Sequence, residues 1–226
     1  MAATLVRAGR RARDRHLVLL DAAVGYLALG RWLHRRGLRM PPVVPDRTDV
    51  FDAAIDTCAG RAGGGGRLLY LELGVHEGES MRYWVRRVAD PDARFVGFDS
   101  FEGLPESWNE EARRGHFGTG GRCPDITDDR VAFVTGWFED TLPDYEPPPH
   151  DVLVVALDAD LYSSTITALR ALRVHLRPGA WLYFDELNDR NHELKALDEF
   201  LDESGLVIEP RAAARNLRHW LFRVVG

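Results

Sequence analysis

From residue 67 to the end of the chain, short apolar runs alternate with segments of helical periodicity. Such alternation predicts strands and helices in turn, because a parallel strand needs a crossover connection before the next strand can pair with it. The predicted strands are 67–73, 94–98, 131–135, 151–157, 180–184, 206–210 and 218–224. The predicted helices between them are 80–88, 165–176 and 191–204. This order favours an α/β fold with a doubly wound, mostly parallel sheet.

The N-terminal part of the chain has a different pattern. Residues 4–38 carry apolar side chains at helical spacing with arginines between them, which predicts one or two amphipathic helices that end before Pro41. A further helix is expected over residues 49–59. We therefore expect a helical extension or lid over residues 1–60 and an α/β domain over residues 61–226.

Charge and composition narrow the functional class. The chain has 226 residues, of which 45% are hydrophobic, and a formal net charge of −6. This charge does not suggest a nucleic-acid partner, although residues 1–40 hold nine arginines and only two acids. The apolar stretch 16–33 is interrupted by Asp21 and is too short and polar for a membrane span, and no signal-peptide cleavage site follows it. With two cysteines, Cys58 and Cys123, expected to be free thiols, a cytoplasmic protein is predicted.

Glycines and acids follow the predicted strands at the points where these strands end. In an open parallel sheet, ligands bind beyond the carboxyl ends of the strands. After the first strand, Gly74 and Gly78 allow a sharp turn and a close approach of a ligand to the backbone, and Ser80 is placed to cap the next helix. After the second strand, Asp99 is placed to accept hydrogen bonds from ribose hydroxyls, with a turn or a helix cap as the alternative.

Two strands that should be neighbours end in carboxylates. The fourth predicted strand is followed by Asp158 and Asp160, and the fifth by Asp185 and Glu186. Unpaired carboxylates at one edge repel each other and raise each other's pKa, whereas Mg²⁺ binds such oxygens readily. The pattern predicts a magnesium site of Asp158, Asp185 and Glu186. The alternative is a set of solvated acids in which Asp160 caps the helix beginning near Tyr162.

Four sequence blocks appear in order along the chain. They are ELGVHEGES at 72–80, GFDSFEGLPE at 97–106, GWFEDTLP at 136–143 and LDADLYSST at 157–165. Together they resemble the macrocin O-methyltransferase family of class I S-adenosylmethionine-dependent methyltransferases, over roughly residues 67–205. The resemblance implies a Rossmann-like fold, with a seven-stranded, mostly parallel sheet, antiparallel final strands and helices on both faces.

The resemblance also implies a cofactor site for S-adenosyl-L-methionine. The methionine part would lie along the first strand's turn, the ribose at the acid after the second strand, and the adenine near the third block. The cofactor-binding positions implied in this way are Glu72, Gly74, Gly78, Ser80, Asp99, Ser100, Gly136, Trp137, Phe138 and Asp158.

A magnesium ion is implied as well. Sugar O-methyltransferases of this family hold Mg²⁺ at positions that match Asp158, Asp185 and Glu186 here. Two positions depart from the family's pattern. His76 stands where the common class I motif has glycine, and Glu186 stands where the sugar enzymes usually have aspartate, so that its extra methylene moves the ligand oxygens.

The predicted reaction is methyl transfer to a hydroxyl oxygen of a small molecule, such as a sugar of a natural product. Mg²⁺ would lower the pKa of the hydroxyl, and the catalytic residue Asp158 would take its proton. The histidines at 76, 116 and 192 are alternative proton acceptors. Substrate choice is expected in the loop 100–130, where Trp108, His116 and Phe117 are candidate lid residues, and in the N-terminal helices. These helices are also a candidate contact between two copies of the chain.

Other functional classes remain as alternatives at this point. A metal-independent methyltransferase would use the acids only to orient the acceptor. A non-catalytic S-adenosylmethionine-binding protein of the same fold has no need for the acids after the fifth strand. An NAD-binding or nucleotide-sugar-binding protein is disfavoured, because the Gly-x-Gly-x-x-Gly fingerprint is missing.

Overall fold

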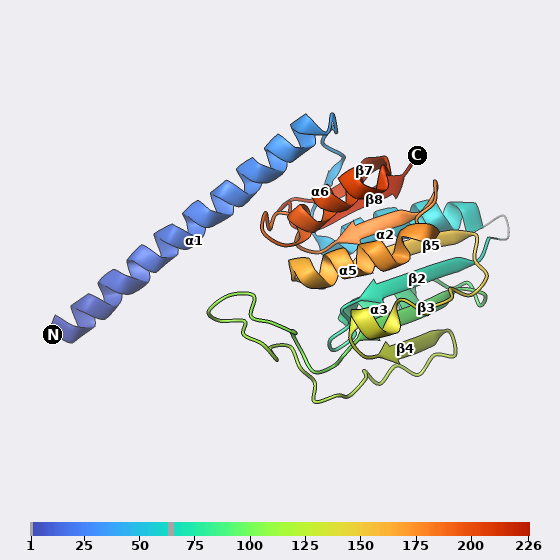
Figure 1. Cartoon of the computed structure of the whole chain (residues 1–226), viewed down its shortest axis with the longest axis horizontal. Coiled ribbons are helices and arrows are strands. Elements are labelled where there is room, and N and C mark those ends of the chain that lie inside the picture. The colour runs from blue at the N-terminus through green and yellow to red at the C-terminus, as the bar shows by residue number, and fades with distance from the viewer. Residues whose placement is uncertain (1, 63–65) are drawn as a thin grey trace.

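Helices lie on both faces of one mixed sheet, and a long helix extends away from it (Figure 1). The structure, a computed structural model, describes residues 2–62 and 66–226, with side chains from residues 19–58 and from residue 66 onward. The elements are α1 (Ala2–Arg35), β1 (Val43–Val44), α2 (Arg47–Ala62), β2 (Leu68–Leu73), α3 (Glu79–Arg87), β3 (Arg94–Asp99), β4 (Val131–Thr135), α4 (Phe138–Thr141), β5 (Val152–Leu157), α5 (Tyr162–Leu172), η1 (Arg173–His175), β6 (Trp181–Phe184), α6 (Glu193–Ser204), β7 (Ile208–Ala214) and β8 (Trp220–Val224).

The strand order is β1-β7-β8-β6-β5-β2-β3-β4 across the described residues. All seven predicted strands form, and the two final strands pair antiparallel with each other, so the predicted fold class is confirmed. The sheet has eight strands rather than seven, because β1 adds a two-residue parallel pairing to β7. A strand this short leaves no periodic signal in the sequence. Because β1 and α2 both pack with the sheet, residues 43–62 lie against the body, and the domain boundary at residue 60 stays a prediction.

The sheet separates two apolar layers. Leu69 and Leu71 of β2 face the layer formed with α5, α6 and the end of α1, whereas Leu68 and Tyr70 face α2 and α3. The ring of Tyr70 stacks on Trp84 of α3 with a centroid distance of 4.4 Å. Burial on both faces explains why the central strands read as continuous apolar runs rather than alternating ones.

The N-terminal segment forms one helix, α1, which ends at Arg35 and not at the prolines. Gly37 adopts a positive φ of 67°, and the N–H of Leu38 donates to the carbonyl oxygen of Leu33 at 2.9 Å. This is a glycine-terminated helix end, which closes the helix before Pro41 is reached. The last turns of α1 pack on the sheet body, while its N-terminal half extends away (Figure 1). Within the described ranges, no helix has the length and apolar composition needed to cross a membrane.

The end of α1 is attached to α6 through one carboxylate. The indole Nε1–H of the buried Trp32 donates to Asp198 Oδ1 at 2.8 Å, and Arg35 and Arg36 form ion pairs with the same side chain. We expect Asp198→Ala to lower the free energy of unfolding by about 2–3 kcal/mol, because it leaves the buried indole N–H of Trp32 without an acceptor and removes the ion pairs of this carboxylate with Arg35 and Arg36. Thermal unfolding measures the effect.

Asp202→Ala is the matched control. Asp202 pairs with Arg36 at 2.8 Å, but its side chain is 73% exposed, so its removal should change the unfolding temperature little. Equal losses of stability in the two variants would contradict the attachment of α1 through Asp198.

Candidate functional site

A cavity of about 420 Å³ lies at the carboxyl ends of the parallel strands. Residues at or after the carboxyl ends of β2, β3, β4, β5 and β6 line it, and one further residue, Arg47, comes from α2. The predicted cofactor and metal residues that line it are Glu72, Gly74, Ser80, Asp99, Ser100, Gly136, Trp137, Phe138, Asp158, Asp185 and Glu186. Gly78 does not line the cavity but begins α3 beside it. All the predicted cofactor and metal residues except Gly78 therefore line one cavity, as expected for residues at the carboxyl ends of parallel strands.

The turn after β2 depends on glycine at one position. Gly74 has a φ of 94°, and a Cβ there would overlap the backbone carbonyl oxygen of Asp158. The ends of β2 and β5 therefore approach each other too closely at this position for any side chain. His76, the departure from the common motif, has a φ of 50°, so a histidine here adopts the backbone conformation that glycine usually supplies.

Ser80 does not cap α3, which corrects the prediction. Gly78 is the N-cap with a φ of 76°, no side chain caps the helix, and Ser80 lies inside its first turn. The hydroxyl oxygen of Ser80 instead accepts a hydrogen bond from the guanidinium of Arg47. The N-cap is therefore the left-handed Gly78, two residues before the predicted Ser80.

Asp99, at the end of β3, holds the turn after β2 by hydrogen bonds. Its Oδ2 accepts from the backbone N–H groups of Val75 and His76, each at 2.8 Å, and its Oδ1 accepts from the N–H of Phe101 at 2.7 Å. A carboxylate offers about four acceptor positions, so these three bonds leave room for a ligand hydroxyl. The ribose role stays a prediction, and the structure adds a role in shaping the loop.

Glu72 is a buried carboxyl group with an unsatisfied oxygen. It is 1% exposed on β2, and its Oε2 has no hydrogen-bond partner among the described residues. Burial raises the pKa of Glu72 to about 8, although the charge of Arg47 opposes the shift. A buried polar atom of this kind is costly unless a ligand satisfies it. Its place on the cavity wall suits a cationic or hydrogen-donating group of a ligand.

Asp158 and Asp185 share a cation that the sequence did not reveal. Arg47 Nη2 lies 3.7 Å from Asp158 Oδ2, and its Nε lies 3.5 Å from Asp185 Oδ1. Burial alone would lower the pKa of Arg47, but the two aspartates outweigh it and the net shift is upward. Burial and the neighbouring Asp185 raise the pKa of Asp158 well above its usual value, and Arg47 offsets part of that shift.

A buried network fixes Asp185. The hydroxyl of Tyr183 donates to Asp185 Oδ1 at 2.6 Å, and His219 Nδ1 lies 3.1 Å from the same oxygen. Burial by itself raises the pKa of Asp185, but His219, Arg47 and Tyr183 together bring it below the usual value. His219 stands just before β8, which runs beside β6, so only the pairing of these two strands brings it to the site.

Glu186 pairs with a different arginine, Arg218. The guanidinium of Arg218 donates to its Oε1, and its backbone N–H donates to the buried carboxylate of Glu193 at 2.8 Å. Over the described ranges, no cluster of three or more His, Cys, Asp or Glu side chains is arranged to hold a metal ion. With Arg47 beside two of the acids and Arg218 on the third, the predicted magnesium ligands do not fit a divalent cation in this arrangement.

Asp160 lies in a strained loop at the cavity wall. Its φ is 56°, and α5 begins after Leu161 without a side-chain cap, so the alternative that Asp160 caps this helix is wrong. Burial, with a contribution from Asp185, raises its pKa to about 7, while Arg218 opposes the shift. A non-glycine residue held in this conformation is a frequent mark of a functional position.

The candidate histidines have other surroundings. His192 Nδ1 accepts the backbone N–H of Tyr162 at 3.1 Å, which is a structural role at the start of α5. His76 lines the cavity and is exposed, whereas His116 does not line it.

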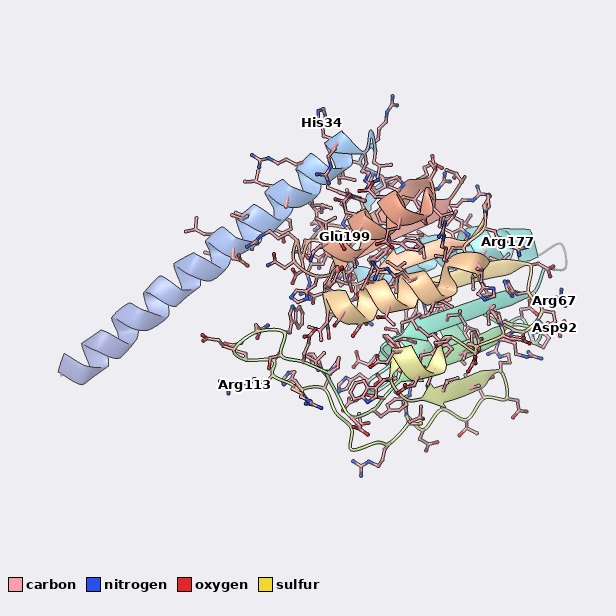
Figure 2. The ribbon with its side chains drawn as sticks, viewed as in Figure 1. His34, Arg67, Asp92, Arg113, Arg177 and Glu199 are labelled. Atoms are coloured by element: carbon pink, nitrogen blue, oxygen red, sulfur yellow. The ribbon has the colours of Figure 1, made fainter. Side chains whose placement is uncertain are left out.

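The loop 100–130 covers the cavity from one side. Trp108 Nε1–H donates to Asp189 at 3.2 Å, and the hydroxyl of Ser163 donates to Glu106 at 2.6 Å. Trp108 and Phe117 line the cavity, as expected for lid residues. The loop extends beyond the edge of the sheet, and Arg113 marks its outer part (Figure 2).

Comparisons with known proteins agree with this fold. The family model of macrocin O-methyltransferases (TylF) matches residues 121–211. The chain is 35% identical to a tetracenomycin 4′-O-methyltransferase of Streptomyces olivaceus, over 51% of each chain. It is 30% identical to demethyldecarbamoylnovobiocin O-methyltransferase of Streptomyces niveus, over 66% of this chain and 64% of that protein. The matched stretch thus spans about half of the first relative and less than two thirds of the second.

Solved structures give the same picture of the fold. The calicheamicin methyltransferase CalS11 superposes with a TM-score of 0.57 at 25% identity, covering 79% of this chain and 80% of that one. The O-methyltransferase NovP superposes with a TM-score of 0.57 at 24% identity, covering 76% and 78%. These matches show that the chain is similar to the macrocin O-methyltransferase family, whose model covers residues 121–211.

Proposed function

We propose that this chain is an S-adenosylmethionine-dependent O-methyltransferase that acts on a hydroxyl group of a small molecule, such as a sugar of a natural product. The observation that carries the proposal is the acidic cavity at the carboxyl ends of β2, β3 and β5, lined by the residues of the four blocks. The names of the two relatives support the choice of acceptor, because both are O-methyltransferases that act on natural products.

The residues at the cavity fit the cofactor. Glu72 offers an unsatisfied buried oxygen, and Asp99 holds the turn while keeping room for a hydroxyl. When bound, S-adenosylmethionine supplies a methyl group on a positively charged sulfur. Trp108 and Phe117 of the loop 100–130 line the same cavity. The role of the protein is to orient an acceptor hydroxyl close to the methyl group. Such orientation can lower a reaction barrier by up to about 7–11 kcal/mol.

Asp160 is the proton acceptor in this proposal. A general base works best when its pKa lies near the operating pH, and burial raises the pKa of Asp160 to about 7. Its carboxylate would take the proton of the acceptor hydroxyl. Asp158, which was predicted as the catalytic residue, lies nearer to Arg47 and is assigned to holding the acceptor.

Magnesium is not part of the proposed mechanism. Asp158 and Asp185 already lie beside the guanidinium of Arg47, and Glu186 pairs with Arg218. The metal-independent alternative is therefore favoured. The predicted cytoplasmic location and self-association through the N-terminal helices stay predictions.

The proposal is tested by calorimetric binding of S-adenosylhomocysteine to the purified chain, with Mg²⁺ and again after chelation. We expect saturable binding with the same affinity in both conditions, because arginines already lie beside the three predicted metal ligands. Methyl transfer to glycosylated acceptors should also persist after chelation. No binding in either condition would exclude the methyltransferase assignment. Loss of turnover after chelation would show that the reaction needs a metal ion.

A further inference from the structure

The cavity is acidic and holds one cationic side chain that is always charged. Nine carboxylates line it, and among the described lining residues Arg47 is the one lysine or arginine. The acids are Glu72, Glu77, Glu79, Asp99, Glu139, Asp158, Asp160, Asp185 and Glu186. Any ligand group with a negative charge is repelled from most of this surface. Arg47 is the lining side chain that can form an ion pair with such a group.

The position of Arg47 is defined by contacts on two sides. Its guanidinium lies over the ring of Phe51, 5.4 Å from the ring centroid, and donates to the hydroxyl of Ser80 in the first turn of α3. No side chain caps α3, a nine-residue helix that begins at the turn after β2. The guanidinium and the positive end of this helix therefore face the same part of the cavity.

Arg47 has donors left for a ligand. A guanidinium carries five N–H donors, and the one hydrogen bond that the described residues show for it goes to Ser80. Its distances of 3.7 Å to Asp158 and 3.5 Å to Asp185 are those of ion pairs without hydrogen bonds. The side chain is 31% exposed, so its free N–H groups are reachable from the cavity.

Glu72 offers a buried, unsatisfied oxygen in the same cavity. Glu72 and Arg47 line the same cavity, and each shifts the pKa of the other. The amino-acid end of the cofactor carries an ammonium group and a carboxylate on one carbon. A buried acid with an unsatisfied oxygen beside a guanidinium with free donors is complementary to that pair of charges.

We propose that Arg47, together with Ser80, binds the carboxylate of the cofactor's methionine moiety. This inference rests on the proposed function and extends it to α2, a part of the chain that was expected to be an extension or lid. Arginine suits the role because its planar fork matches a carboxylate with two parallel hydrogen bonds.

The test compares two ligands that differ by this group alone, S-adenosylmethionine and decarboxylated S-adenosylmethionine. Calorimetry measures the affinity of both for the wild-type chain and for Arg47→Met. We expect Arg47→Met to weaken binding of S-adenosylmethionine by about ten- to a hundredfold, the usual effect of losing a charged hydrogen bond. Binding of the decarboxylated compound should stay unchanged.

Arg87→Met is the matched control. Arg87 also connects α2 with α3, through Asp52 at 2.8 Å, but it lies outside the cavity lining. It should leave the affinity for both ligands unchanged. If Arg87→Met reproduces the loss, or if Arg47→Met weakens both ligands equally, the effect comes from docking of α2 and the proposal is wrong.

Arg47→Lys covers the case in which the methionine variant does not fold. Lysine keeps the charge but loses the fork, so it should weaken S-adenosylmethionine selectively and by a smaller factor. An unchanged affinity for S-adenosylmethionine in Arg47→Met, with tight binding to the wild type, would overturn this inference alone. A wild-type chain that binds neither compound would overturn the proposed function with it.

Discussion

Replacing Asp160 by asparagine is expected to lower kcat by about 10²–10⁴-fold, the usual contribution of a general base. The variant should still bind S-adenosylhomocysteine as the wild type does. Asparagine has nearly the same shape, and it tolerates the positive φ of 56° at this position well. The fold should therefore persist, and the loss of rate reports the missing proton acceptor.

The pH dependence gives a second measurement of the same assignment. Asp160 must be deprotonated to accept a proton, and its pKa is raised to about 7. The value of kcat/KM should therefore rise as the pH increases through about 7 and level off above it. This ascending limb should be absent in Asp160→Asn.

The Asp158→Asn variant distinguishes between Asp158 and Asp160 as the general base. If Asp158 were the base, as the sequence suggested, its asparagine variant would lose the ascending limb and Asp160→Asn would keep it. With Asp160 as the base, Asp158→Asn should weaken binding of the acceptor while the limb remains. A limb that persists in Asp160→Asn would contradict the proposed role.

Gly74→Ala should remove cofactor binding and destabilise the fold strongly. A Cβ at this position would overlap the backbone carbonyl oxygen of Asp158, and backbone cannot turn aside as a side chain can. We expect a loss of about 2–6 kcal/mol in the free energy of unfolding, from overpacking and from the unfavourable φ together. Because the turn that carries Val75 and His76 must shift, S-adenosylhomocysteine should no longer bind measurably.

Gly179→Ala isolates the effect of the backbone conformation. Gly179 has a similar φ of 105°, but a Cβ there meets nothing within 4 Å. It should cost about 1–3 kcal/mol for the strained φ alone and leave the affinity for S-adenosylhomocysteine unchanged. Equal stability and equal ligand affinity in the two variants would show that the contact between Gly74 and Asp158 does not shape the site.

The local pattern of apolar and polar residues was sufficient to predict most of the helices and strands. The apolar run of β2 and the periodicity of α6 place these elements to within two residues of their observed bounds. A parallel strand buried on both faces has to be apolar throughout, and this requirement is readable in a single stretch of chain. The short elements β1 and α4 were missed, because two and four residues carry no period.

The sequence by itself also determined where the site lies, since glycines and acids at strand ends collect at one edge of a parallel sheet. Only the tertiary structure decided how the charges there are neutralised. Arg47 arrives through packing of α2 on the sheet, and His219 through the pairing of β8 with β6. An ion pair depends on distance through space, which motif spacing does not encode. For that reason the sequence favoured a metal ion among Asp158, Asp185 and Glu186, whereas the folded chain places arginines beside them.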